Sequence, residues 1–200
     1  FLVRHNLDLN PKPPEDILII GIDAVSIDKV GVPWPWPRQF HAALVDALND
    51  SKVKLIFFDI IFDTISPLSL QTQEVQGDQT ISMSSVDAGV EDDEFFAKAI
   101  STSMNVFLAC EAEPLSKTKY HVATPVDAFL KALSNDVGFL GNTAVSYDND
   151  NFVRRAKVVF PEFYNDPAIS TSIPLRVAQK FFGEKAVILQ NGYVQIGKNQ

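Results

Sequence analysis

The residues of this chain that are best suited to chemistry are one arginine, one tryptophan and three aspartates. Arg38 ends a proline-rich segment that also holds Trp36, and Asp23 and Asp59 each follow an apolar run of strand length. Asp92 belongs to an acidic run that precedes a further apolar stretch. One guanidinium offers five donors and can serve two carboxylates at once. These five residues predict a polar cluster that either binds a ligand or neutralises itself as a buried network.

Known catalytic patterns fit the sequence poorly. Asp59 and Asp63 stand four positions apart, whereas the Asp-x-Asp-x-Thr loop of one phosphatase class needs its carboxylates two apart. Residues 148–151 begin like a calcium loop but lack its glycine and its distal glutamate, which favours a simple turn. The three histidines are scattered without ligand spacing. We therefore predict no catalytic residue, no metal ion and no cofactor. A metal-dependent hydrolase built on Asp23 and Asp59 stays open as an alternative.

The composition is that of an acidic globular chain. Its 200 residues carry a formal net charge of −8, and 46% of them are hydrophobic. This charge argues against nucleic acid or an anionic lipid surface as a partner, because both need clustered Lys and Arg. Cys110, the single cysteine, ends an apolar run, so we expect a buried thiol and no intrachain disulfide. The apolar stretches are too short to span a membrane.

Strand-like and helix-like patterns alternate along the chain. Short apolar runs between turn residues predict strands, and apolar positions three and four apart predict helices. This order predicts an α/β fold with a mainly parallel or mixed central sheet, helices on both faces and some antiparallel edge strands. The predicted strands are 17–22, 53–60, 105–110, 137–142, 153–160 and 193–196, and helices are predicted over 38–49, from about 91, over 125–133 and over 170–182.

The predicted topology gathers the polar residues at one edge of the sheet. If 17–22 and 53–58 are parallel strands joined by the helix that starts at Arg38, both strands end at the same edge. Asp23, Asp59 and Arg38 then lie there together, and so does Asp92 if the next helix begins with it. Ligands of open α/β sheets bind outside the carboxyl ends of the strands. The alternative is that Arg38 only neutralises the carboxylates and fixes the tryptophan-containing loop.

The chain reads as one domain behind a short lead-in. Three prolines within residues 1–14 predict an extended lead-in that stiffens the approach to the first core element. Residues 15–200 contain no low-complexity linker, so we predict a single domain. Within it, residues 63–90 are rich in Gln, Ser, Thr and Asp, and we predict a long polar loop at the surface.

The order of several short motifs resembles the type-two CHASE domain, a name that abbreviates cyclase and histidine-kinase associated sensory extracellular. The resemblance covers roughly residues 15 to 183. Its most specific part is Trp-Pro-Arg at its distance from Asp23 and Asp59. The motifs that carry it are Ile19–Asp23, Val30-Gly31, Pro35–Arg38, Phe58–Phe62, Asp92-Asp93, Phe95, Pro125, Val137–Phe139, Asn142, Tyr147–Asp150 and Arg154-Arg155.

This resemblance implies a function. Such domains are extracytoplasmic sensory parts of bacterial membrane receptors, placed between an N-terminal membrane helix and further C-terminal ones. The cytoplasmic output is an adenylate or diguanylate cyclase, a histidine kinase or a Ser/Thr kinase. We therefore expect a periplasmic or extracellular input domain that is not itself an enzyme. We expect it to pass an unknown small-molecule or environmental signal through a homodimeric receptor. A purely structural dimerisation spacer is the remaining alternative.

Overall fold

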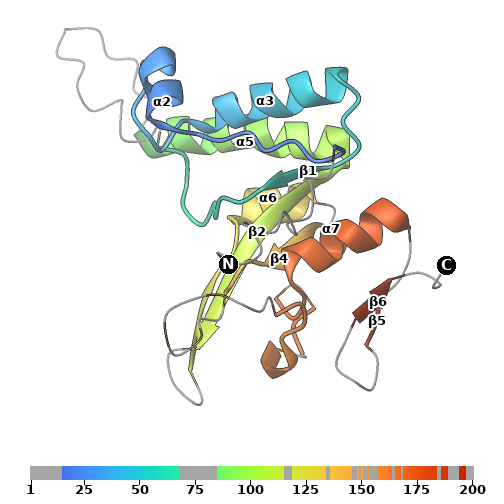
Figure 1. Ribbon diagram of the computed structural model, residues 1–200. Helices are drawn as coiled ribbons and strands as arrows, with labels where there is room; N and C mark the ends of the chain where they lie inside the picture. The colour runs from blue at the N-terminus through green and yellow to red at the C-terminus, as the bar shows by residue number, and fades with distance from the viewer. Residues whose placement is uncertain are drawn as a thin grey trace, which may run out of the picture. The chain divides into compact units, whose positions relative to one another are not determined.

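The computed structural model describes most of the chain in two compact units, residues 1–34 and residues 35–200, which are taken here one at a time (Figure 1). The longer described ranges are 15–67, 85–114, 119–133, 136–145, 157–163 and 169–183. The shorter ones are 148, 150, 153, 165–167, 186–188 and 194–196. Among the helices in these ranges, none has both the length and the apolar character needed to cross a membrane.

The first unit contains one short helix, α2 (Ala24–Val30), and no strand in its described part. The strand predicted at 17–22 is therefore wrong. Residues 17–20 have no regular secondary structure and are 51–87% exposed, and they pair with no neighbouring strand among the described residues. An apolar run shows only that a segment suits a strand, whereas a strand exists only where its backbone groups pair with a neighbour.

The second unit is built on a mixed four-stranded sheet, which confirms the predicted α/β fold. Its strands are β1 (Ile56–Phe58), β2 (Val106–Pro114), β3 (Tyr120–Ala123) and β4 (Leu140–Asn142). The long strand β2 pairs in parallel with both β1 and β4, and its C-terminal half pairs antiparallel with β3. A separate antiparallel pair is formed by β5 (Ala186–Ile188) and β6 (Val194–Ile196). Strand β1 is shorter than the predicted 53–60.

Helices cover both faces of this sheet. Phe96 of α5 (Ser85–Ser103) packs on Phe58, and α3 (Arg38–Asp50) packs against α5, so these helices cover the face that bears Phe58. Phe107 points to the opposite face, because its neighbour Leu108 is the register partner of Phe58. On that face Phe107 contacts Phe139. The Lys180 side chain of α7 (Ile173–Phe182) lies over the Phe139 ring, so α7 covers this face. Figure 1 shows α7 and the α3–α5 pair on opposite sides of the sheet.

The contact between α7 and β4 is unusually close. Gly141 of β4 is buried, and a Cβ atom added there would lie 2.6 Å from Cα of Ile173 in α7. Real Cβ atoms do not approach a backbone atom so closely, so any side chain at this position must push the helix away from the strand.

The predicted helix 170–182 is confirmed with a later start, at Ile173. It is closed by Gly183, whose φ of 69° is left-handed.

Two predictions for the middle of the chain need correction. Helix α5 begins at Ser85, not near residue 91, so its acidic run lies inside the helix. The predicted loop 63–90 is therefore wrong over 85–90, and Ser66 is fully buried. Residues 68–84 lie outside the described residues. The capping signal at 124–127 is followed by α6 (Asp127–Ala132), although no side chain caps that helix.

The remaining predictions concern the C-terminal third. The strand predicted at 137–142 is a 3₁₀ turn (Val137–Phe139) followed by β4, so only its second half is a strand. Within the predicted strand 153–160, Val159 forms a single bridge to Thr171, and residues 154–156 lie outside the described residues. The turn predicted at 147–151 is likewise described only at two of its positions. The terminal strand is confirmed as β6.

Candidate functional site

Helix α3 begins with a capping arrangement that its own sequence cannot supply. Its N-cap is Pro37, which has no side-chain acceptor for the exposed N–H groups of the first turn. The missing acceptor comes from Asp92 in α5. Oδ2 of Asp92 accepts the backbone N–H of Arg38, and its Oδ1 accepts that of Gln39 at 3.0 Å. A negative charge is favourable here, because the helix dipole is positive at this end.

A third segment, residues 62–67, closes the site. The Ser66 hydroxyl donates to Oδ2 of Asp92, and the Ser66 backbone N–H donates to Oδ2 of Asp93 at 3.3 Å. Arg38 reaches the same segment, since its Nη2 donates to the Thr64 carbonyl at 2.8 Å. We call Arg38, Ser66, Asp92 and Asp93 the Arg38 cluster. It joins α3, α5 and the segment after β1 through hydrogen bonds that bridge 26 to 54 positions in sequence.

The Arg38 cluster is buried and carries one positive against two negative charges. Arg38 is 5% exposed, and Asp92 and Asp93 are each 3% exposed. Nε of Arg38 lies 3.4 Å from Oδ1 of Asp93, and the guanidinium carbon lies 4.7 Å from the centre of the Phe62 ring. Ring and guanidinium attract each other electrostatically.

Burial changes the ionisation of both members of this ion pair. It lowers the pKa of Arg38, and the carboxylates of Asp93 and Asp92 oppose that change. It raises the pKa of Asp93 to about 6, although the Arg38 charge and the Ser66 N–H act in the other direction. The guanidinium stays charged, so Asp93 is the member of the pair that can become neutral.

A buried histidine stands next to the cluster on α3. His41 is 2% exposed and packs against the rings of Phe58, Phe62 and Phe96, with centroid distances of 5.2–5.9 Å. Burial first, and the positive charge of Arg38 second, lower its pKa to about 4. The same three rings and Phe129 contact one another edge-on, at 5.1–5.8 Å. His41 is thus a neutral member of an aromatic core.

The structure brings together some of the predicted site residues and not others. Arg38 and Asp92 meet, as the sequence predicted. Trp36 is half-buried and packs on Phe40 of α3 at 5.9 Å. Asp59 is exposed directly after β1, and no hydrogen bond or ion pair joins it to Arg38 in the described part of the chain. The chain runs on from Asp59 to residues 62–67 before it reaches the cluster, so a shared sheet edge did not produce contact.

Asp23 has a local function in the first unit. Its carboxylate accepts the backbone N–H of Ser26 at 2.8 Å and the Ser26 hydroxyl at 2.7 Å, and so caps α2. These hydrogen bonds to the charged form lower the pKa of Asp23. The sequence signal at Asp23 is therefore explained by a capping box.

Sequence reasoning missed Ser66 and His41 and undervalued Asp93. Asp92 and Asp93 precede the core residue Phe96 by four and three positions, so helical spacing places both on the buried face of α5. This spacing points to the interior of a helix, whereas an acidic run alone is also typical of a helix start. Nothing in the sequence around Ser66 marks it, because its role depends on where residues 62–67 meet two helices.

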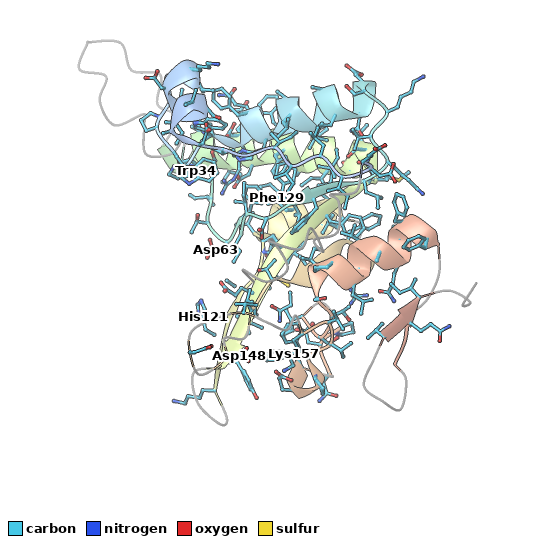
Figure 2. The ribbon with its side chains drawn as sticks, viewed as in Figure 1. Trp34, Asp63, His121, Phe129, Asp148 and Lys157 are labelled. Carbon is cyan, nitrogen blue, oxygen red and sulfur yellow. The ribbon has the colours of Figure 1, made fainter. Side chains whose placement is uncertain are left out.

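Phe129 points into the interior of the second unit and Asp63 stands at its surface (Figure 2).

A second polar feature lies at the opposite end of α3. A shallow hollow between α3 and α5 is lined by Asp46, Asn49, Asp50, Ala99, Thr102 and Ser103.

Within the described ranges, no three His, Cys, Asp or Glu side chains are placed to hold a metal ion together. Cys110 is buried in β2, and its burial raises the pKa of the thiol to about 12.

Comparison with known proteins identifies the family. The family model described as the CHASE2 domain matches residues 1–199, which includes both units. Comparisons with curated proteins and with solved structures gave no significant match. The match spans the Trp-Pro-Arg segment, the Arg38 cluster and the mixed sheet. The chain therefore belongs to the CHASE2 family, whose members are extracellular sensory domains of signalling receptors.

Proposed function

We propose that the chain is the extracytoplasmic input domain of a transmembrane bacterial receptor. In this role it passes a ligand or stress signal through flanking membrane helices to a cytoplasmic adenylate cyclase, histidine kinase or Ser/Thr kinase. The observation that carries the proposal is the family match over residues 1–199. The domain itself performs no catalysis in this proposal, and any reaction belongs to the cytoplasmic part of the receptor.

The Arg38 cluster supports this role by its position in the chain. Arg38 is the fourth residue of the second unit, so the segment that enters from the first unit leads directly into it. The cluster ties the first turn of α3 to α5 and to residues 62–67. Any signal that rearranges the cluster therefore changes the start of α3, where the chain arrives. A buried polar network with two arrangements is a suitable element for such a switch.

The proposed partners follow from the receptor architecture and from the charge. The receptor acts as a homodimer, and the signal is a small molecule or an environmental change. Nucleic acid is not a partner, because the net charge of −8 repels the phosphate backbone.

The location is tested on the full-length protein in intact spheroplasts. External protease is expected to cleave the domain while the cytoplasmic output domain stays intact until the membrane is opened. Protection of the domain in intact spheroplasts, or a full-length protein without any membrane span, would contradict the proposal.

The sensory role is tested by a mild change at Arg38. Arg38→Lys keeps the charge but removes the planar fork that serves Asp93 and Thr64 together. The receptor's cyclase or kinase output is expected to change roughly two-fold or more, as for a coupling change of about 0.5–2 kcal/mol. Lys98→Arg, at an exposed position of α5, is the matched control. A folded Arg38→Lys receptor whose output equals that of the control would argue for a structural spacer.

A further inference from the structure

The two carboxylates of the Arg38 cluster are satisfied to different degrees. Asp92 accepts hydrogen bonds from two backbone N–H groups and from the Ser66 hydroxyl. Asp93 accepts the Ser66 N–H at 3.3 Å, and its Oδ1 faces Arg38 Nε at 3.4 Å in a geometry that makes no hydrogen bond. A buried carboxylate is stable as an anion only when donors surround it. Among the described residues, Asp92 therefore accepts three hydrogen bonds and Asp93 accepts one.

The charges around Asp93 do not balance. The groups that face it are Arg38 from α3, Asp92 from its own helix and the Ser66 N–H from segment 62–67. Asp63, in the same segment, is exposed and acts on Arg38, and His41 stands one turn further along α3. Helix α6 also packs on α5, but its charged side chains, Asp127 and Lys131, are exposed. The cluster thus holds a net charge of −1 in a buried position when both carboxylates are ionised.

We propose that the Arg38 cluster is a proton-binding site, in which Asp93 takes up a proton from mildly acidic surroundings and so loses its ion pair with Arg38. The proton comes from solvent and adds to one carboxylate oxygen, and no other bond is made or broken. The neutral acid no longer attracts the guanidinium as an ion, and Arg38 keeps its side-chain hydrogen bond to the Thr64 carbonyl. Asp92 keeps the cap on α3, so the helix stays formed while the ion-pair contact between α3 and Asp93 is lost.

The ionisation of the neighbouring groups agrees with this assignment. Burial raises the pKa of Asp93 to about 6, whereas burial and Arg38 lower the pKa of His41 to about 4. Between these values the proton is bound by Asp93 while the neighbouring imidazole stays neutral. The proposal depends on the sensory function only for its use in signalling, since proton uptake is a property of the folded chain alone.

The test is a carboxyl ¹³C NMR titration of the chain of residues 1–200 from pH 3 to pH 8, with Asp93→Asn used to assign the signal. Asp93 is expected to titrate near pH 6, and the Ser66 amide proton is expected to shift with the same midpoint, because it donates to Asp93. Asp23 is the internal control, since its pKa is lowered from the ordinary value of 3.8 by Ser26. In Asp93→Asn the Ser66 transition is expected to disappear.

An Asp93 signal that titrates at or below pH 4, or a Ser66 transition that persists in Asp93→Asn, would overturn the proton site and leave the sensory proposal standing. The converse failure is also distinguishable. A normal titration near pH 6, combined with a receptor whose output is unchanged by pH and by Asp93→Asn, would support the proton site and remove its use in signalling.

Discussion

Asp92 caps the helix that Arg38 begins, although the two residues are separated by 54 positions and lie on different helices. The cap joins α3 to α5 at a point where Pro37 leaves the first turn without a side-chain acceptor. The same carboxylate binds the Ser66 hydroxyl, so one side chain fixes the relative positions of three segments. A change at Asp92 is therefore a change in the tertiary structure and not only in a helix end.

Removing this cap lowers stability. Asp92→Ala leaves the buried N–H of Arg38, the N–H of Gln39 and the Ser66 hydroxyl without their acceptor. We expect the free energy of unfolding, measured by urea titration, to fall by about 1–3 kcal/mol or more. The control is Glu91→Ala, one position earlier and exposed, which should change it by less than about 0.5 kcal/mol. Equal effects of the two substitutions would show that Asp92 does not act as the cap.

Arg38 and Asp93 are expected to be energetically coupled. Arg38→Ala leaves two buried carboxylates without a counter-ion and should cost roughly 3–5 kcal/mol. The double variant Arg38→Ala/Asp93→Ala removes one of those unpaired charges, so it should cost less than the sum of the two single variants. A double-mutant cycle in urea measures this difference. Strict additivity would show that the 3.4 Å contact contributes no interaction energy.

The stability of the chain between pH 6.5 and 4 depends on two opposing groups. The pKa of Asp93 is raised from 3.8 to about 6, so the folded state binds this proton first and Asp93 adds stability as the pH falls. The pKa of His41 is lowered from 6.5 to about 4, so the unfolded state binds that proton first and His41 removes stability over the same range. The two contributions nearly cancel.

Single substitutions should uncover each contribution. Relative to the wild type, His41→Phe should gain stability as the pH falls from 6.5 to 4, and Asp93→Asn should lose it. The difference per group is on the order of 3 kcal/mol for a shift of about two pKa units. Urea unfolding at pH 4.5 and at pH 7 measures both. Two variants whose stability follows the wild type at both pH values would contradict the opposing roles.

The close contact between β4 and α7 predicts a glycine that cannot be replaced. Gly141→Ala places a Cβ atom 2.6 Å from Cα of Ile173, and the resulting shift of α7 should cost about 1–3 kcal/mol. Gly21→Ala is the matched control, because no atom lies within 4 Å of its added Cβ. Thermal unfolding should show a lower Tm for Gly141→Ala and little change for Gly21→Ala. A normal Tm for Gly141→Ala would mean that the strand and helix are further apart.

The sequence by itself determined the local elements and part of the site. Helical spacing after Pro37 predicted α3, Gly183 marked the end of α7, and alternating strands and helices predicted the α/β class, because these features depend on neighbours in the chain. The sequence also predicted that Arg38 and Asp92 meet. It reached that result from a helix start near residue 91, whereas α5 begins at Ser85 and presents Asp92 from its interior.

Only the tertiary structure decided which polar groups share a buried site. Ser66 joins the cluster, and the Thr64 carbonyl accepts from Arg38, because residues 62–67 contact α3 and α5. Asp59 stays outside the cluster although it lies only five positions before Thr64. The apolar run 17–20 suits a strand, but no strand in the described part of the chain pairs with it. The spacing of residues within one segment sets the backbone conformation of that segment. Strand pairing, the capping of one helix by another and the sharing of one guanidinium depend instead on distances between segments. Local sequence does not encode these distances.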